Sequence, residues 1–331
     1  MRQVVLKHPI DHKPHADDFK IVETARPACP EGGVVVKLSH VSMDPYVGAR
    51  LRGRHMGEPA PMPGEDAIPG HGVGVVIESR SDKVSEGDAV HLMEAGWRDY
   101  AAAAAGAVRL ISTEAIAPQA YLSVLGMPGL TAWAGMTQLA RVKEGETVLI
   151  DAAAGAVGGT AGQIARARGA ARVVGIAGGA QKCSLVTDTY GFDACIDYRA
   201  PGWEDTLNDA LGDGIDVHFE NVSSDILNLA LTRMKPYGRA ILCGLAAHYQ
   251  TGQPAPGINF GPIIGARASL HGLVVYDFYD RWDAFTDEIA PFVRAGEITI
   301  AEDLAAGLAA APEAFERLMD GRNRGKALIA L

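Results

Sequence analysis

A glycine-rich segment in the middle of the chain has the residue types and spacing needed to bind a dinucleotide. Residues 148–152 have the composition of a buried strand, residues 153–159 (Ala-Ala-Gly-Ala-Val-Gly-Gly) predict a tight turn, and residues 160–169 predict a helix. Such a turn lets backbone N–H groups at a helix N-terminus approach a pyrophosphate, whose charge the helix dipole favours. The same sequence also suits a turn that only packs a helix against a strand.

The strand that follows ends without an acidic residue. In an NAD-binding protein, an Asp or Glu about 20 residues after the glycines binds the ribose 2′-OH. Here residues 171–177 form the predicted strand, Gly178 and Gly179 take the place of the acid, and Lys182 follows. A carboxylate would repel a 2′-phosphate, whereas a lysine attracts it. The sequence therefore predicts a site for NADPH.

The elements that must position these residues fall into two parts. At 331 residues the chain is long enough for two domains with separate cores. Before about residue 120, short strand-like runs such as 33–38, 72–77 and 88–92 are punctuated by Gly and Pro and predict a β-rich unit. Residues 118–138 favour helix, with a break at Pro128, and bridge into the second part.

From residue 147 onward, predicted strands alternate with helical stretches. A βαβ repeat of this kind implies a parallel sheet covered on both faces, so we expect a Rossmann-type, doubly wound α/β unit. The tail at 326–331 is strand-like, and we expect it to return to the first unit, which is then discontinuous. The predicted strands are 147–152, 172–177, 194–198, 215–220, 239–243 and 270–276.

Composition and charge argue against several classes of function. The net charge of −10 is spread along the chain, which disfavours nucleic acid as the main partner. No apolar run is long enough to span a bilayer, and Lys7 and His8 interrupt the start, unlike a secretory signal. We therefore expect a cytoplasmic protein with no membrane partner. The cysteines lack CxxC spacing and are expected to be free thiols: Cys29, Cys183, Cys195 and Cys243.

Several separated motifs cover nearly the whole chain. They are 43–46 (Met-Asp-Pro-Tyr), 126–132, 155–158, 178–182, 191–193, 196–198, 219–222, 243–245 with Tyr249, and 323–326 (Asn-Arg-Gly-Lys). In this order they resemble the medium-chain dehydrogenase/reductase superfamily, in the zinc-free branch of alkenal double-bond reductases, prostaglandin reductases and curcumin reductase. The resemblance implies a GroES-like β-rich substrate and catalytic domain at 1–120 plus 300–331 and a Rossmann NADPH-binding domain at 121–299. It also implies a homodimer joined at residues 269–276.

The resemblance assigns roles to individual residues. Lys182 and Tyr198 match contacts to the 2′-phosphate, and Asn221 follows a strand at the edge where ligands of such sheets collect. Structural roles stay open: a solvated lysine, a packed tyrosine, an asparagine in a turn, and plain core strand for residues 273–275. The implied cofactor-binding residues are Gly155, Ala156, Val157, Gly158, Lys182, Tyr198, Asn221, Cys243, Gly244, Leu245, Tyr249, Leu273, Val274, Val275 and Asn323.

The cysteine pattern disfavours a zinc site. Zinc-dependent relatives carry an early catalytic cysteine, a Gly-His-Glu motif and four clustered cysteines. This chain has Gly-His-Gly at residues 70–72 and no cysteine between Cys29 and Cys183, so the thiolate ligands are missing. His71 and His91 remain as imidazoles, and structural roles are expected for them. Without a Lewis acid, reduction of an activated C=C bond is favoured over alcohol/ketone interconversion.

The implied reaction is transfer of a hydride from NADPH to the β-carbon of a hydrophobic α,β-unsaturated ketone or aldehyde, followed by protonation of the enolate at the α-carbon. Candidate donors to the enolate are Tyr46, Tyr249 and the cofactor ribose hydroxyl. Tyr46 could instead be a packing residue. Some relatives carry another tyrosine in the loop that here reads 257–260, where Asn259 is the only polar side chain, so the proton source stays open.

Other interpretations also remain. The same cofactor site would serve an NADPH quinone oxidoreductase, and a non-catalytic NADPH-binding protein would share the same motifs. Four apolar residues could line a substrate pocket or belong to the ordinary core: Val47, Met56, Met62 and Phe260.

Overall fold

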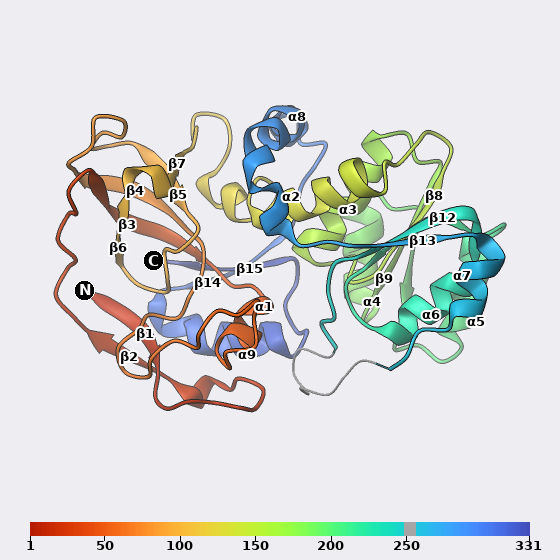
Figure 1. Ribbon diagram of the computed structural model, residues 1–331, viewed down its shortest axis with the longest axis horizontal. Helices are drawn as coiled ribbons and strands as arrows, with labels where there is room; N and C mark the ends of the chain where they lie inside the picture. Colours follow the sequence, from red (N-terminus) through yellow and green to blue (C-terminus); the bar gives the residue numbers. More distant parts are fainter. Residues whose placement is uncertain (248–255) are drawn as a thin grey trace. The chain divides into compact units, whose positions relative to one another are not determined.

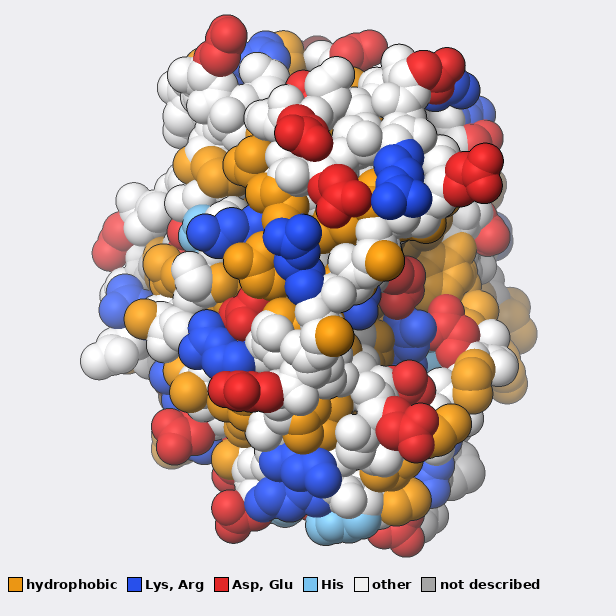
Figure 2. All heavy atoms as spheres, turned by 90° about the vertical axis from the view of Figure 1, so that its left-hand side faces the viewer, with side chains coloured by type: hydrophobic (Ala, Val, Ile, Leu, Met, Phe, Trp, Pro, Cys, Tyr) orange, Lys and Arg blue, Asp and Glu red, His pale blue; other side chains and the backbone are white. Residues whose placement is uncertain are grey.

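The computed structural model describes residues 1–247 and 256–331, and these fall into two units (Figure 1). Unit 1 comprises residues 1–122 and 301–331, and unit 2 comprises residues 123–247 and 256–300. Within these residues, no helix combines the length and apolar character needed to traverse a lipid bilayer. On the face shown in Figure 2, acidic and basic side chains are interspersed with apolar ones.

Unit 1 is built around a seven-stranded sheet of order β14-β15-β3-β4-β5-β7, with β6 also paired to β3. The valines at 34–36 of β3 are fully buried, and Phe19, Trp97 and Phe315 pack with ring centroids 5.1–6.1 Å apart. The strands are β1 (Arg2–Leu6) and β2 (Phe19–Glu23), which form a separate pair, β3 (Gly33–Ser42), β4 (Gly72–Ser79), β5 (Ala89–Leu92), β6 (Tyr100–Ala104), β7 (Val108–Leu110), β14 (Glu302–Ala306) and β15 (Lys326–Ala330); the helices are α1 (Tyr46–Arg50), α9 (Ala311–Met319) and the short 3-10 helices η1 (Ala16–Asp18), η2 (Ala105–Ala107), η3 (Pro118–Leu122) and η7 (Leu308–Ala310).

The tail strand β15 lies inside this sheet, parallel to β14 and antiparallel to β3 (Figure 1). Its first residue, Lys326, is buried and donates hydrogen bonds from Nζ to Met43 O (2.8 Å) and Asp44 Oδ1 (2.6 Å). Burial opposes the charge on Asp44, yet the Lys326 ammonium and the Ser42 hydroxyl hold the pKa of this carboxyl below its usual value. The ion pair fixes the segment that joins β3 to α1.

Unit 2 contains a six-stranded parallel sheet of order β10-β9-β8-β11-β12-β13, which confirms the predicted doubly wound α/β class. Leu149 and Val174 share a core with α5 and α6, whereas Gly175 faces Phe192 on the opposite side. The strands are β8 (Thr147–Ile150), β9 (Arg172–Ala177), β10 (Ala194–Asp197), β11 (Ile215–Glu220), β12 (Met234–Leu242) and β13 (Ser269–Gly272); the helices are α2 (Met127–Trp133), η4 (Ala134–Leu139, π), α3 (Ala156–Ala167), α4 (Ala180–Ser184), η5 (Leu185–Thr189, π), α5 (Trp203–Leu211), α6 (Ser224–Thr232), α7 (Phe260–Ala266), η6 (Val275–Arg281, 3-10) and α8 (Trp282–Arg294).

Two helix boundaries differ from the sequence prediction. The helix after the glycine turn begins at Ala156, not Thr160, so Gly158 lies in its first turn. A Cβ there would stand 2.6 Å from Ala152 O, so the glycine serves close packing of helix against strand. Pro128 does not break the helix that precedes the glycine turn. It stands in the first turn of that helix, α2, where a missing N–H costs no hydrogen bond.

Strand ends also differ. The strand predicted at 147–152 ends at Ile150, because Ala152 adopts φ 45°. The strand predicted at 270–276 ends at Gly272, and Val275 begins a 3-10 helix. β12 starts earlier than predicted, at Met234, with an irregularity opposite β11 in which Tyr237 takes φ 63°.

Candidate functional site

The carboxyl ends of the parallel strands of unit 2 collect most of the predicted cofactor residues. Because these strands run in one direction, their carboxyl ends share one edge of the sheet, where ligands of doubly wound folds bind. Tyr249 lies outside the described residues, and Asn323 and Tyr46 belong to unit 1. At the edge, in chain order, are residues 155–158 after β8, Lys182 after β9, Tyr198 after β10, Asn221 after β11, residues 243–245 after β12 and residues 273–275 after β13.

The N-terminus of α3 fits a pyrophosphate. Its N-cap, Gly155, offers no side-chain acceptor to the first N–H groups, and the first turn contains no acidic residue. The first hydrogen bond of the helix runs from Gly159 N to Gly155 O (2.9 Å). The N–H groups of residues 156–158 are those that a helix start leaves without an intrahelical acceptor, and an anion satisfies them.

At the end of β9, two polar side chains lie where a side chain at position 178 would begin. A Cβ on Gly178 would lie 2.9 Å from both the Tyr198 hydroxyl and Arg199 Nε. Gly179 has φ 93°, which favours glycine, and its N–H donates to Asp197 Oδ1 (2.7 Å). The place of the missing acid is therefore occupied by a tyrosine and an arginine.

Arg199 was not among the residues predicted from the sequence. Its guanidinium lies 5.6 Å from the centroid of the Tyr198 ring, and Tyr198 is 45% exposed. The nearby Asp197 accepts backbone hydrogen bonds from Gly179 and Arg199, and these lower the pKa of its carboxyl. A cation directly after Tyr198 is the sequence signal that could have identified this residue.

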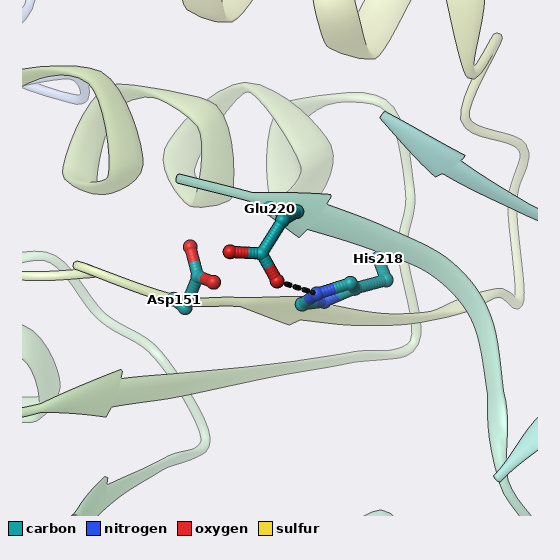
Figure 3. A group of neighbouring side chains, drawn as sticks. All are labelled: Asp151, His218 and Glu220. Atoms are coloured by element: carbon teal, nitrogen blue, oxygen red, sulfur yellow. Dashed lines mark hydrogen bonds and ion pairs between the residues drawn. The ribbon is translucent and has the colours of Figure 1, made fainter. Parts of the chain in front are cut away.

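A buried acidic pair lies at the ends of β8 and β11 (Figure 3). Asp151 Oδ1 accepts a hydrogen bond from Asn221 N (2.6 Å). Glu220 Oε1 accepts from Val222 N (2.6 Å) and Ser223 N (2.7 Å). Together the two carboxyl groups hold three consecutive N–H groups of the turn between β11 and α6.

Figure 3 shows the Glu220 carboxyl between Asp151 and the ring of His218, whose Nε2 lies 3.0 Å from Glu220 Oε2. Burial and the neighbouring Glu220 raise the pKa of Asp151 well above its usual value, whereas His218 helps to hold the pKa of Glu220 below its own against the effect of burial. The pair therefore favours a proton on Asp151 and a charge on Glu220, which reduces the negative charge at the edge where the predicted cofactor residues collect.

The same three residues are the one group among the described residues with the composition of a metal site, with ligand atoms within 4.8 Å of one another. Both oxygens of Glu220 and one of Asp151 already accept hydrogen bonds. Only Asp151 Oδ2 and His218 Nδ1 lack a hydrogen-bond partner. Two atoms do not make a metal site, and we interpret the group as a hydrogen-bonded network.

The network also holds the segment after β12. Cys243 N and Gly244 N donate to Glu220 O (2.9 and 3.2 Å), and Ala246 N donates to Asn221 O (3.0 Å). The Asn221 side chain is oriented by a bond from Nδ2 to Asp151 O (3.2 Å). Burial, with both acids nearby, raises the pKa of the Cys243 thiol to about 12, so it is not a thiolate at neutral pH.

The last edge residues differ in exposure. Leu273 is buried and continues the pairing with β12 through its N–H, which donates to Leu242 O (3.0 Å). Val274 is exposed, and Val275 begins η6. Only Leu273 thus has the surroundings of a core strand residue.

In unit 1, Tyr46 begins α1 and packs its ring on that of His55, with centroids 4.9 Å apart. Burial lowers the pKa of His55, which keeps the imidazole neutral at pH 7. Asn323 Nδ2 donates to Gly325 O (2.8 Å) within its own turn before β15. Val47 belongs to the core, so its role is packing, whereas Met56 and Met62 are exposed.

Two further polar groups have structural roles. Asn259 caps α7, because its Oδ1 accepts from Gly261 N (3.0 Å), and this bond does not involve the Nδ2 donor. His71 Nδ1 and His91 Nε2 are 3.1 Å apart and buried. Burial lowers the pKa of His71 to about 4, so this ring is neutral, and each ring satisfies the other.

Two family models match the chain. One, described as the N-terminal domain of oxidoreductase, covers residues 2–111, and the other, described as zinc-binding dehydrogenase, covers residues 156–291. The match to the zinc-binding dehydrogenase model therefore does not include the two buried histidines of unit 1, His71 and His91.

Characterised relatives match over almost the whole chain. A 2-alkenal reductase (NADP(+)-dependent) of Nicotiana tabacum is 36% identical over 99% of this chain and 96% of its own. An NADPH-dependent curcumin reductase of Escherichia coli is 34% identical over 96% of this chain and 92% of its own. The crystal structure of CurA from Vibrio vulnificus in complex with NADPH has a TM-score of 0.91 at 31% identity, covering 100% of this chain and 99% of that one.

The acidic pair predicts an unusual pH dependence of stability. Asp151 keeps its proton in the folded protein above about pH 4, where an unfolded Asp loses it, so its contribution to stability falls as pH rises. Asp151→Asn keeps an Oδ1 acceptor for Asn221 and does not titrate. Relative to wild type, the variant should gain unfolding free energy as the pH rises above about 4, by at most about 1.4 kcal/mol per pH unit.

The measurement is urea unfolding followed by tryptophan fluorescence at each pH. Asp213→Asn, at an exposed position, is the matched control and should follow wild type at every pH. Parallel curves for Asp151→Asn and wild type would show that Asp151 is ionised in the folded protein.

Proposed function

Because this chain belongs to the medium-chain dehydrogenase/reductase superfamily, in the branch of the 2-alkenal, curcumin and prostaglandin reductases, we propose that it reduces the C=C bond of α,β-unsaturated ketones or aldehydes with NADPH. The relatives span nearly the full length of both chains, so the family predicted from the motifs is confirmed, and the chain is an NADP-dependent oxidoreductase.

The observation that carries the choice of cofactor is the end of β9. Tyr198 and Arg199 fill the space that an acidic side chain at position 178 would need, and Lys182 stands on the following helix. We propose that these three side chains bind the 2′-phosphate of NADPH. Arginine and lysine form charge-assisted hydrogen bonds with phosphate, which are roughly twice as strong as neutral ones.

The remaining cofactor contacts follow from the strand ends. The N–H groups of residues 156–158 bind the pyrophosphate. The contacts along the cofactor toward its nicotinamide come from Asn221, residues 243–245 and residues 273–275. Asn323, near the end of the chain, contributes a further cofactor contact. Glu220 and Asp151 position these cofactor-binding residues indirectly, because their carboxyl groups accept hydrogen bonds from the backbone of the turn at 221–223.

The bound cofactor supplies the hydride. We propose that Tyr46 donates a hydrogen bond to the carbonyl oxygen of the substrate and so stabilises the enolate that forms there. The Asp44–Lys326 ion pair positions Tyr46, since it fixes the backbone two residues before it. Tyr249, as a second donor, remains part of the proposal.

We propose that the reaction needs no metal ion. The two buried imidazoles of unit 1 are hydrogen-bonded to each other, and the chain has no cysteine between Cys29 and Cys183 to add a thiolate. Enolate stabilisation by hydrogen-bond donors then replaces the Lewis acid.

We also propose a cytoplasmic homodimer joined through β13. This strand ends the sheet order of unit 2, so its outer edge has no strand partner within the described residues. Apolar side chains are exposed on the neighbouring elements, with Phe260 69% and Ile264 74% exposed on α7. All four cysteines are unpaired by disulfides, as in a reducing compartment.

Purified protein should oxidise NADPH when an alkenal or enone is added, and much more slowly with a quinone.

Lys182→Ala should raise the KM for NADPH about tenfold or more, because it removes a charge-assisted contact of about 1.5–3 kcal/mol. It should leave the KM for NADH unchanged. The fall in absorbance as each reduced cofactor is oxidised gives the KM values for NADPH and NADH. Lys143→Ala, at an exposed position of the same unit, is the control. Equal use of NADPH and NADH by wild type would contradict the proposal.

Tyr46→Phe should lower kcat for an enone about a hundredfold, as expected for loss of one oxyanion donor, without changing the affinity for NADPH. Steady-state kinetics and a fluorescence titration with NADPH separate the two effects. Tyr100→Phe, on strand β6 of the same unit, serves as control. Unchanged turnover in Tyr46→Phe would return this tyrosine to a packing role.

Sedimentation equilibrium should give a mass twice that of the 34.8 kDa chain. Ile264→Asp, which places a charge on the apolar surface next to β13, should shift the protein toward the mass of one chain. A wild-type protein of single-chain mass at micromolar concentration would exclude the dimer.

A further inference from the structure

Three histidines gather around a buried carboxyl group in the connection between β1 and β2. His8, His12 and His15 stand at the start, middle and end of residues 7–15, and Asp18 follows in η1. The three histidine side chains are 59%, 45% and 57% exposed, whereas that of Asp18 is 8% exposed. Neither the proposed cofactor contacts nor the proposed enolate donors include any of these groups.

Two of the imidazoles approach the same oxygen of Asp18. His12 Nε2 lies 3.2 Å from Asp18 Oδ1, and His8 Nε2 lies 3.7 Å from it. In a tetrahedral zinc site with bonds of about 2.0–2.2 Å, neighbouring ligand atoms stand about 3.3–3.5 Å apart. The two separations lie on either side of this range, so the carboxylate oxygen and each ring nitrogen have nearly the spacing of a ligand pair.

The backbone holds the carboxyl group of Asp18 in place. Its Oδ2 accepts a hydrogen bond from His15 N (2.7 Å), and Asp18 N donates to His15 O (3.0 Å). Lys7 N donates to Asp18 O (2.8 Å), which joins the two ends of the connection. Carboxylates that ligate metals are themselves oriented by hydrogen bonds in this way. Oδ1, the oxygen that faces both imidazoles, is therefore fixed in direction.

His12 has a second carboxylate on the other side of its ring. Its Nδ1 lies 3.7 Å from Asp11 Oδ1, and its ring stacks on that of His15 with centroids 5.7 Å apart. Histidines that ligate metals commonly present their second ring nitrogen to a carboxylate, which sets the tautomer. A proton on Nδ1 leaves the Nε2 lone pair of His12 directed toward Asp18.

These residues differ from the network of Asp151, His218 and Glu220 in their access to solvent. That network is buried, and among the described residues it is the one group whose ligand atoms all lie within 4.8 Å of one another. In the connection between β1 and β2, one ring must therefore turn to complete a site. His8 can do so, because its side chain is exposed.

We propose that His8, His12 and Asp18 bind one divalent transition-metal ion, with water in the remaining coordination position. Imidazole nitrogens suit zinc, copper and nickel, and a carboxylate oxygen completes a ligand set that zinc accepts. The ion links the start, middle and end of the connection. It thereby stabilises the pairing of β1 with β2 and the contact of this segment with α9, where Ala16 N donates to Glu316 Oε2 (2.7 Å). The site goes beyond the proposed function and takes no part in hydride transfer.

The test titrates the full-length protein, first treated with a chelator and desalted, with zinc chloride by isothermal titration calorimetry. Wild type should bind one zinc ion per chain at micromolar concentration. His8→Gln, His12→Gln and Asp18→Asn should each weaken binding at least about tenfold, because loss of even an outer partner of a metal ligand costs about 10–100-fold.

Two matched variants serve as controls. Asp17→Asn changes an exposed acid next to Asp18, His271→Gln changes a histidine of unit 2, and both should bind zinc like wild type. Zinc should also raise the Tm of wild type, because the ion binds the folded protein, and leave the Tm of His8→Gln unchanged. Since His8 is exposed, this variant keeps its fold, and lost binding in it reports the lost ligand.

Absence of one-to-one zinc binding by wild type would overturn the proposal. So would an unchanged zinc Kd in His8→Gln and His12→Gln, which would place the ion elsewhere, such as at the buried pair His71 and His91. None of these measurements uses NADPH or an enone. Failure of the protein to reduce enones would therefore refute the proposed function and leave the metal site intact.

Discussion

The cofactor edge of unit 2 depends on the electrostatics of two buried carboxyl groups, each of which opposes the charge on the other. Asp151 ends one strand and Glu220 the neighbouring one, and between them they hold the N–H groups of residues 221–223. The repulsion between them favours a proton on Asp151, which reduces the negative charge near the start of α3. A second charge there would oppose a pyrophosphate at the same helix terminus. The position of Asn221, and of the segment at 243–247 bonded to the same turn, follows from this arrangement.

Unit 1 solves a similar problem in another way. Its buried acid, Asp44, keeps its charge because Lys326 is buried with it at 2.6 Å, and removing one partner of such a pair is far more destabilising than replacing both. The result is again a fixed backbone at the end of a strand, here before Tyr46. In each unit, a buried polar group holds the segment from which a functional side chain extends.

The sequence was sufficient for the fold class, because the alternation of strands and helices after residue 147 has few topological solutions. The glycine turn and the missing acid after β9 were also readable, since both depend on local residue types. Pairings between distant residues were not. Asp151 reads as part of a strand until Glu220 is placed beside it, and Arg199 gains meaning only when its side chain fills the space above Gly178. The role of Asn259 as a helix cap was not readable either, because it depends on where α7 begins. Tyr249 falls outside the described residues, so its role stays a prediction.

The placement of β15 inside the sheet of unit 1 has a consequence for biosynthesis. Lys326 follows its partner Asp44 by 282 residues, and residues 40–42 of β3 gain their partner β15 only when residues 328–330 have been made. All of unit 2 leaves the ribosome in that interval, at roughly 5–20 residues per second. Unit 2 can complete its sheet before β15 is made. During this time the edge of β3 in unit 1 is unpaired and Asp44 lacks its partner Lys326. Order of synthesis thus makes the first-made unit the last to finish folding, and that interval is when a chaperone would be needed most.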